Sequence, residues 1–271
     1  MSAAVTFQQY TVHAAPEAQE AGAVALAVAS LPESFGPAAS VNQADVQVIS
    51  GQPGWTVRAA EAVATGARGV VVVNPAAENT DSLQAAAQQS GAAVVLDQRW
   101  ASNPAVPGAE DAVRSMVGRA ALLDTVATAQ VGTDSGELFA DHLAAVVRLA
   151  GPLANLRHLR RGPHGYTTTG VLANGAPVAI QGVVSNARPA ALDFRLLTDD
   201  GGVSVTLPEP LAAWPATVKV TGPQGELLLP TIYESAHRAT WRRLKEHLDA
   251  GSSSSDLHRF AALTESITAL S

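Results

Sequence analysis

Short apolar runs occupy much of the first half of the chain. Four of them, at residues 23–29, 45–49, 69–73 and 92–96, are rich in Ala, Val, Leu or Ile. Short apolar runs that end in turn residues are typical of buried strands, and the continuous β-branched run at 69–73 is typical of a strand covered on both faces of a parallel sheet. We therefore interpret all four as short buried strands.

Two segments between these runs carry apolar residues at helical spacing. One starts at Trp55 and reaches Gly66, and the other starts at Asp81 and reaches Gly91. Glycine is the residue that most often follows the end of a helix. The order strand, helix, strand, helix, strand predicts right-handed βαβ crossovers and a parallel α/β sheet.

The pattern changes in the second half of the chain. A helical stretch over residues 137–150 stops at Gly151, and residues 166–184 and 192–205 then alternate in polarity around an Asn-Gly pair and a Gly-Gly pair. Asn-Gly between alternating runs is the strongest short hairpin signal. This part therefore predicts a mainly antiparallel sheet.

The last segments of the chain are two amphipathic helices separated by the serines at 252–255. Their apolar stripes favour packing in a core or between subunits over a ligand site. The first stripe consists of Trp241, Leu244 and Leu248, and the second of Leu257, Phe260, Leu263, Ile267 and Leu270.

These elements predict an α/β protein of two domains. Residues 1–120 would form a shortened Rossmann-like parallel-sheet domain, and residues 121–271 an α+β domain with an open, mainly antiparallel sheet and the two closing helices. The first 40 residues are interrupted by Pro16, Pro32 and Pro37. They look too short and too broken for the first strand, helix and second strand of a complete Rossmann fold.

Composition narrows the functional classes. The formal net charge of −7 argues against a nucleic-acid binder, since phosphate binding needs clustered Lys and Arg. The one basic run, at residues 157–161, is more easily read as a solvated strand face than as an anion site. Cysteine is absent and the histidines have no ligand spacing, so no disulfide and no metal site is expected. We expect a cytoplasmic protein without a membrane segment.

Several short motifs follow one another at informative spacing. Pro53 follows the second apolar run, Pro75 follows the third, and Arg99 and Pro104 follow the fourth. Further on, residues 136–142 open the helical stretch that ends at Gly151. In this order the chain resembles, from residue 45 to its end, the Gfo/Idh/MocA (glucose-fructose oxidoreductase and inositol dehydrogenase) family of sugar dehydrogenases.

The resemblance implies a nicotinamide cofactor, but the family's working residues are missing. Its phosphate-binding Gly-x-Gly-x-x-Gly turn has no counterpart before Val41, and its Glu-Lys-Pro motif is replaced by Val73, Asn74 and Pro75. Asparagine cannot carry the charge of the lysine or titrate near neutrality. The turn with Gly51, Pro53 and Gly54 is a weak candidate for a cofactor site, because a tight turn explains it as well.

The resemblance also indicates where a substrate would be expected. Counted back from Gly151, the family's catalytic histidine falls on Asp141, with His142 next to it. Asn74, Asp141 and His142 are therefore the candidates for catalysis. Pro75, Arg99 and Glu137 are the candidates for the substrate cleft.

Three functional hypotheses remain open at this point. The first is a non-catalytic or regulatory protein that needs no cofactor and binds a sugar-like ligand. The second is an active sugar or polyol dehydrogenase that binds NAD or NADP through residues 14–22 and uses Asp141 or His142 as a base. The third is a structural subunit that completes an oligomer with a catalytic paralogue. Homo- or hetero-oligomers would form through the C-terminal sheet.

Overall fold

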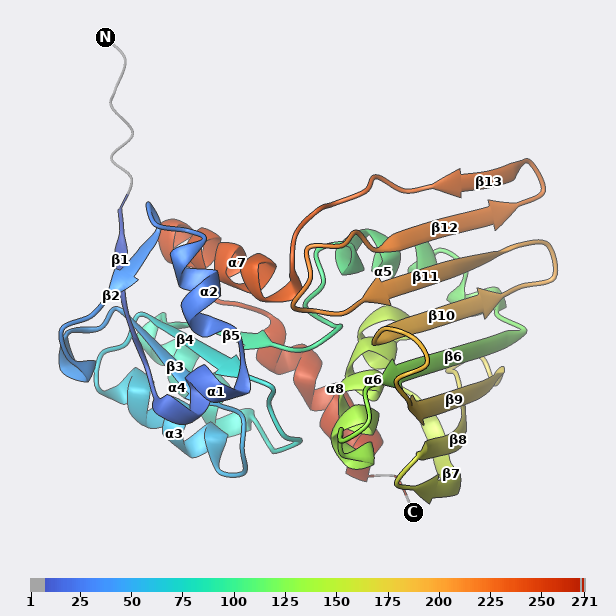
Figure 1. Cartoon of the computed structure of the whole chain (residues 1–271), viewed down its shortest axis with the longest axis horizontal. Coiled ribbons are helices and arrows are strands. Elements are labelled where there is room, and N and C mark those ends of the chain that lie inside the picture. The colour runs from blue at the N-terminus through green and yellow to red at the C-terminus, as the bar shows by residue number, and fades with distance from the viewer. Residues whose placement is uncertain (1–7, 269, 271) are drawn as a thin grey trace, which may run out of the picture. The chain divides into compact units, whose positions relative to one another are not determined.

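The computed structural model describes residues 8–268 and 270, and contacts divide the chain into two compact units (Figure 1). The first unit runs to Asp97 and includes His237–His258, and the second comprises Gln98–Ala236 and Arg259–Ser271. The sequence had suggested a boundary at residue 120 and had placed both closing helices in the second domain. The chain instead returns to the first unit, because helix α7 (Ala236–Ala250) contributes to its core.

A parallel five-stranded sheet forms the centre of the first unit. Its order is β2-β1-β3-β4-β5, with β1 between β2 and β3, which is a strand order of doubly wound folds. The strands expected at 45–49, 69–73 and 92–96 are confirmed. The strands are β1 (Tyr10–Ala14), β2 (Phe35–Pro37), β3 (Val46–Ser50), β4 (Gly69–Val73) and β5 (Ala93–Asp97).

The beginning of the chain corrects two expectations. A first strand, helices α1 (Pro16–Ala21) and α2 (Val24–Ala29), and a second strand all fit between residues 10 and 37. Residues 23–29 are therefore mostly helix and do not form the expected strand. The periodicity of so short an apolar run does not distinguish a buried helix from a buried strand. Pro16 is tolerated because it opens a helix, where its missing N–H costs nothing.

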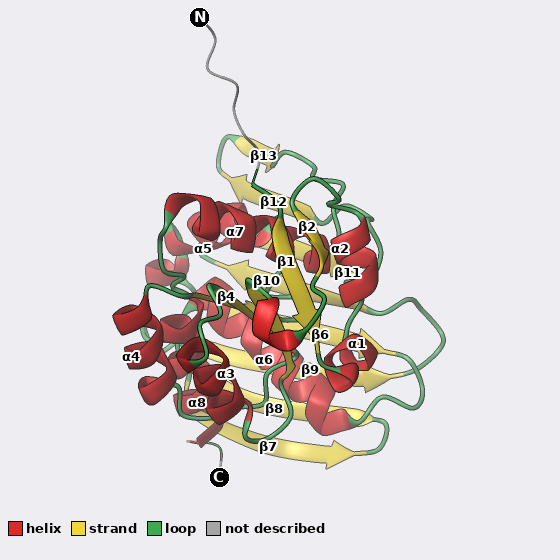
Figure 2. Ribbon diagram, turned by 90° about the vertical axis from the view of Figure 1, so that its left-hand side faces the viewer, coloured by secondary structure: helices red, strands yellow, loops and turns green. Residues whose placement is uncertain are grey.

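Helices cover both faces of this sheet. Helices α3 (Trp55–Ala64) and α4 (Asp81–Ser90), both expected, lie on one side, and α1 and α2 lie on the other (Figure 2). Helix α7 joins the face of α1 and α2, where Trp241 packs edge-on against Phe35 with ring centroids 5.0 Å apart. The first unit is thus a small three-layer α/β sandwich.

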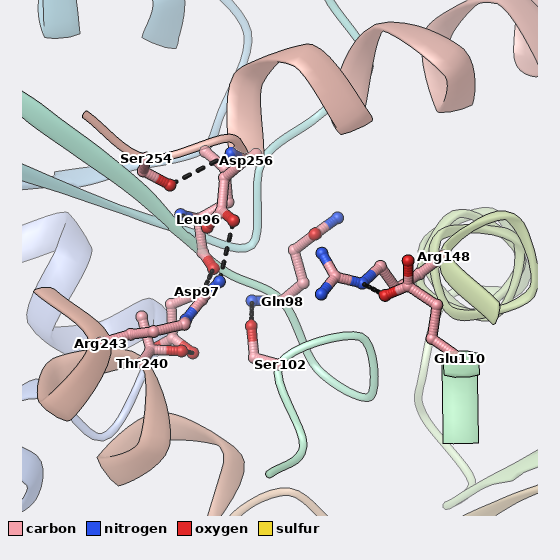
Figure 3. A network of polar contacts seen from close by, with 10 residues as sticks. All are labelled: Leu96, Asp97, Gln98, Ser102, Glu110, Arg148, Thr240, Arg243, Ser254 and Asp256. Carbon is pink, nitrogen blue, oxygen red and sulfur yellow. Dashed lines mark hydrogen bonds and ion pairs between the residues drawn. The ribbon is translucent and has the colours of Figure 1, made fainter. Parts of the chain in front are cut away.

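Side chains complete the outer edge of β5 (Figure 3). Asp256, at the start of α8 (Asp256–Thr268), accepts the Leu96 N–H at 3.0 Å, and Arg243 on α7 donates to the Leu96 carbonyl at 3.3 Å. Arg243 also donates to Asp256 at 2.8 Å. The ion pair therefore takes the place of a sixth strand, and it protects an edge that would otherwise be open.

An eight-stranded sheet forms the second unit, in the order β13-β12-β11-β10-β6-β9-β8-β7. All neighbours are antiparallel except β6 and β9, so the expected open antiparallel sheet is confirmed. The strands are β6 (Leu122–Ala129), β7 (Ala154–Gly162), β8 (Gly165–Val171), β9 (Pro177–Val184), β10 (Ala191–Leu197), β11 (Gly202–Pro208), β12 (Thr217–Gly222) and β13 (Gly225–Leu228).

Helices α5 (Val106–Arg114) and α6 (Ser135–Ala150) pack on one face of this sheet. The Asn-Gly hairpin between β8 and β9 is present, and Gly175 adopts the positive φ of 85° that such a turn needs. Two 3₁₀ helices, Val41–Gln43 and Val117–Arg119, complete the described elements. Within the described residues, no helix combines the length and apolar character that crossing a bilayer requires.

Candidate functional site

The connection between β1 and α1 is where a doubly wound sheet usually holds the phosphates of a dinucleotide. Such a cradle needs several free backbone N–H groups and close approach of the main chain. Here Ala15 donates its N–H to Val48, and Ala18 and Gln19 donate theirs to the Ala15 carbonyl. Pro16 has no N–H, and Glu17 adds a carboxylate to the first turn. These residues do not fit a pyrophosphate.

Asn74 follows β4 in the place of the family's lysine. Its φ of 50° lies in the left-handed region, which asparagine tolerates better than most residues. The side-chain amide donates to the Ala21 carbonyl at 2.9 Å, and the backbone N–H donates to the Asp97 carbonyl at 2.9 Å. Asn74 therefore ties α1 and β5 to the end of β4, which is a structural use of the side chain.

The turn after β3 is closed by its own groups. A Cβ on Gly51 would lie 2.3 Å from the Asn74 carbonyl oxygen and from Pro75 Cα, so only glycine allows the two loops to meet. Gly54 has a φ of 83°. Arg58 donates to the carbonyls of Ser50, Gln52 and Pro53. Glycine and proline at these positions are explained by the turn itself.

The start of α3 carries a resident carboxylate. Glu78 accepts the N–H of Gly54, and it accepts the Thr56 hydroxyl at 3.0 Å and the Thr56 N–H at 3.4 Å. A helix N-terminus attracts anions because its N–H groups are unpaired and its dipole is positive there. Glu78 occupies the position that a ligand phosphate would need.

Arg99 gathers an acidic cluster in the second unit. Its guanidinium lies 4.0 Å from Asp141 Oδ2 on α6 and 3.4 Å from Glu209 Oε2, and it stacks 4.8 Å from the centre of the Trp100 ring. The three charged side chains keep between 20% and 28% of their surface exposed. We call Arg99, Trp100, Asp141 and Glu209 the Arg99 cluster.

The pKa of the Asp141 carboxyl group is raised well above its ordinary value. Burial raises the pKa of its carboxyl to about 7, the nearby Arg99 charge opposes this rise, and Glu137 one turn earlier on α6 adds to it. A carboxyl group that titrates near neutrality can take or give a proton under physiological conditions.

His142 points away from this cluster into the core. Thr125 donates to the Asp193 carbonyl at 2.8 Å, so its oxygen must accept from His142 Nε2 at 2.7 Å. His142 Nδ1 then accepts from the Tyr166 hydroxyl at 2.8 Å. The side chain is fully buried, and burial lowers its pKa to about 3. His142 is thus a neutral, fully bonded core residue, which argues against a catalytic role.

Two buried donors in the Arg99 cluster have no acceptor. Arg99 Nε and Trp100 Nε1 are enclosed and lack a hydrogen-bond partner among the described residues. A buried donor without a partner costs about 1–3 kcal/mol, so such groups call for an explanation. The partly exposed part of the cluster combines the donors of the Arg99 guanidinium with the acceptors of Asp141 and Glu209, a mixture that hydroxyl groups recognise.

The predicted residues thus fall into separate groups. Asn74, Pro75, Gly51, Pro53 and Gly54 come together at the carboxyl edge of the parallel sheet in the first unit. In the second unit, Arg99, Asp141 and Glu137 come together and His142 does not join them. Sequence reasoning missed Glu209 and Glu78, because each lies in an irregular loop without a motif. Within the described residues, no group of side chains could hold a metal ion.

No protein-family model and no curated protein sequence matches the chain. Solved structures do match over nearly the whole length. A UDP-N-acetylglucosamine 3-dehydrogenase from Acidithiobacillus ferrooxidans is 15% identical with a TM-score of 0.65, covering 97% of this chain and 98% of that one. A D-galactose-1-dehydrogenase from Rhizobium etli is 16% identical with a TM-score of 0.67, covering 100% and 97%.

A third match is a 3-ketoreductase from Actinomadura kijaniata in complex with NADP. It is 14% identical with a TM-score of 0.68, covering 97% of this chain and 98% of that one. At such low identity the likeness establishes the fold alone.

Proposed function

We propose that this chain, which has the fold of the Gfo/Idh/MocA-type oxidoreductases, is a non-catalytic binding protein that works without a nicotinamide cofactor. Its ligand would be a small polyhydroxy compound of the sugar or polyol class, held at the Arg99 cluster. A regulatory or assembly role would follow from binding without turnover.

The connection between β1 and α1 carries this proposal. The N–H groups of Ala15, Ala18 and Gln19 are used within the chain, Pro16 lacks one, and Glu17 would repel a phosphate. The second helix start that could hold an anion, at α3, already binds Glu78. Both observations favour a first unit that is complete without a dinucleotide.

The ligand class rests on the composition of the Arg99 cluster. Sugar hydroxyl groups both donate and accept, and they are bound by carboxylates and by planar donors beside an aromatic ring. Asp141 and Glu209 supply acceptors, and the partly exposed Arg99 guanidinium supplies donors beside the Trp100 ring. The sugar-handling enzymes that share the fold make this class the natural starting point.

The absence of cofactor binding can be tested by calorimetry. We expect no saturable binding of NADH or NADPH up to about 1 mM, a concentration at which even weak ligands with a Kd near 1 mM are half bound. Thermal denaturation with myo-inositol and with D-galactose as probes should show a higher Tm for any polyol that binds. An Arg99→Gln chain is the matched control, because it keeps the fold of the loop and loses the guanidinium.

Two results would contradict this proposal. Micromolar binding of either nucleotide would mean that a non-standard cradle exists. A polyol shift that persists in Arg99→Gln would place the ligand elsewhere.

A second candidate function is favoured by one observation. Asp141 titrates near pH 7, which is the property of a general base that removes a proton from a substrate hydroxyl. This candidate is an active sugar or polyol dehydrogenase. Its NAD or NADP would bind at a non-standard site, because the residues after β1 do not form the usual phosphate cradle.

The Asp141→Asn chain distinguishes the two candidates. If the protein is a dehydrogenase, kcat should fall about 100-fold or more in Asp141→Asn, and the parent should show an apparent pKa near 7 in its pH–rate profile. The measurement is reduction of NAD or NADP with a panel of polyols. Equal rates in the two chains would exclude Asp141 as the base, and the non-catalytic proposal predicts no turnover in either.

We further propose that the chain assembles through the sheet of the second unit. One face of this sheet carries α5 and α6, and its other face presents mixed side chains such as Asp193, Arg195 and Thr206 that are half-buried or exposed. A second copy or a catalytic paralogue would complete such a surface. Light scattering of the purified chain would detect assembly with a second copy. Co-purification would detect assembly with a paralogue.

A further inference from the structure

The two edges of the eight-stranded sheet differ in kind. Strand β7 forms one edge, and it carries Arg157, Arg160 and Arg161 at exposed positions together with two shifts in register against β8 (Figure 1). Charged side chains and bulges are the usual devices that prevent an edge strand from pairing with another chain. The β7 edge is therefore blocked.

Strand β13 forms the opposite edge, and it has no shift in register and a single charged residue, Glu226. Its four residues, Gly225, Glu226, Leu227 and Leu228, are all exposed, and it pairs with β12 in regular register. Leu227 is 60% exposed and Leu228 is 54% exposed. No described strand lies beyond β13, so its outer hydrogen-bonding groups face away from the sheet.

The register shows which backbone groups point outward. The Leu229 N–H donates to the Val218 carbonyl, so residues 218 and 229 form a hydrogen-bonded pair. Hydrogen-bonded and non-hydrogen-bonded pairs alternate along an antiparallel ladder. Leu227 therefore bonds to β12, whereas the N–H and C=O groups of Glu226 and Leu228 point outward.

We propose that β13 pairs with β13 of a second copy of this chain, antiparallel about a two-fold axis at Leu227. Glu226 then exchanges two hydrogen bonds with the partner's Leu228, and Leu228 exchanges two with the partner's Glu226. All the outward groups of both residues are used. The inference goes beyond the proposed assembly role, because it concerns the edge of the sheet and not its open face, and it is independent of any ligand.

Neighbouring registers are less favourable. An axis at Leu228 would place Glu226 opposite the partner's Pro230, which has no N–H to donate. An axis at Glu226 would bring two like charges face to face. With the axis at Leu227, Glu226 lies opposite an apolar side chain and the two Leu227 side chains meet. A self-complementary contact of this kind is what a two-fold dimer requires.

Charge also favours this edge over the other. Pairing of two β7 strands would set arginines against arginines, since Arg157, Arg160 and Arg161 lie within five residues of one another. Strand β13 brings only Glu226, which already has an ion pair with Lys219 at 3.0 Å on the neighbouring strand.

The contact is small, and this limits the affinity. A stable interface buries about 800 Å² on each partner, and two four-residue strands bury less than that. We therefore expect a weak dimer in rapid exchange with the monomer, and a test must be able to trap it.

The cysteine-free sequence allows a direct test. In the proposed dimer the two copies of residue 227 form a non-hydrogen-bonded pair with Cα atoms about 4.5 Å apart, within disulfide range. Leu227→Cys should therefore form a covalent dimer under mild oxidation at least about tenfold faster than a control with a cysteine on the blocked edge. Leu159→Cys on β7 is that control, because Leu159 is similarly exposed at 55%.

Leu228→Cys tests the register. Its two copies lie on a diagonal about 7–8 Å apart, near the limit of disulfide formation, so it should cross-link more slowly than Leu227→Cys. Leu227→Lys, which keeps the fold because the position is exposed, should remove any dimer seen by light scattering at high concentration.

Two outcomes would overturn the proposal. Equal cross-linking rates for Leu227→Cys and Leu159→Cys would show that β13 has no preferred partner. A dimer in light scattering that persists in Leu227→Lys would place the contact on another surface and leave the proposed assembly role standing.

Discussion

Between pH 6.5 and pH 3 the free energy of unfolding is expected to fall by roughly 4–5 kcal/mol through His142 alone. Burial holds the pKa of the folded imidazole at about 3, against 6.5 in an unfolded chain. Below pH 6.5 the His142 imidazole therefore binds a proton in the unfolded state but stays neutral in the folded state. The stability from this group is fully present above pH 6.5 and is lost progressively as the pH falls.

Comparison with His142→Gln isolates this effect. Asp141 acts in the opposite direction, because its pKa is raised from 3.8 to about 7 and its contribution therefore declines as the pH rises through that range. The parent alone would show the sum of the two groups. The difference in unfolding free energy between parent and His142→Gln, measured by urea denaturation at several pH values, should shrink as the pH falls. A difference that is constant with pH would contradict the assignment.

A spectroscopic measurement covers the case in which His142→Gln does not fold. In the parent, nitrogen-15 spectra should show a neutral His142 ring with its proton on Nε2 from pH 8 to pH 5. The hydrogen bonds to Thr125 and Tyr166 require this tautomer. A ring that titrates near pH 6.5 would show that the site is open to water.

Asp256→Ala is expected to destabilise the first unit by about 3–4 kcal/mol. The side chain is 7% exposed, and its removal leaves the Arg243 guanidinium and the Leu96 N–H without the carboxylate that they bind. Asp256→Asn should cost less, because an amide oxygen can still accept from Leu96. Chemical denaturation followed by tryptophan fluorescence measures the loss, since Trp241 lies in this unit.

Asp111→Ala is the matched control for this prediction. Asp111 also bonds to an arginine, Arg114 at 2.7 Å, but both side chains are exposed, so the loss should stay below about 1 kcal/mol. Similar losses in the two chains would mean that Asp256 acts as an ordinary surface ion pair.

Regular elements with a strong pattern were predictable from the sequence. The run of valines in β4 and the helical spacing after Trp55 each allowed one interpretation, and the structure confirms both. The run Val24–Ala29 allowed two interpretations, because Ala and Val occur in buried helices and buried strands alike. Strand β13 was invisible, since four exposed residues show no burial pattern.

The candidate site was predictable only where a motif marked it. Arg99 and Asp141 lie 42 positions apart, and their meeting depends on how the loop after β5 approaches α6. Glu209 lies between two prolines, in a loop without periodicity. The sequence did not show that Asp141 belongs to the Arg99 cluster and that His142 lies in the core. Successive residues of a helix differ by about 100° in direction, so the orientation of α6 decides which of the two side chains is buried.

The chain order of the two units has a consequence for synthesis on the ribosome. The eight strands of the second unit are all made once Leu228 has been added, whereas the first unit still lacks Trp241 in its core and Asp256 at the edge of β5. The first unit can therefore complete its core only after the strands of the second unit have been synthesised. During that interval the apolar face that α7 will cover stays open to the solvent, and chaperones that bind exposed apolar surface would act there first.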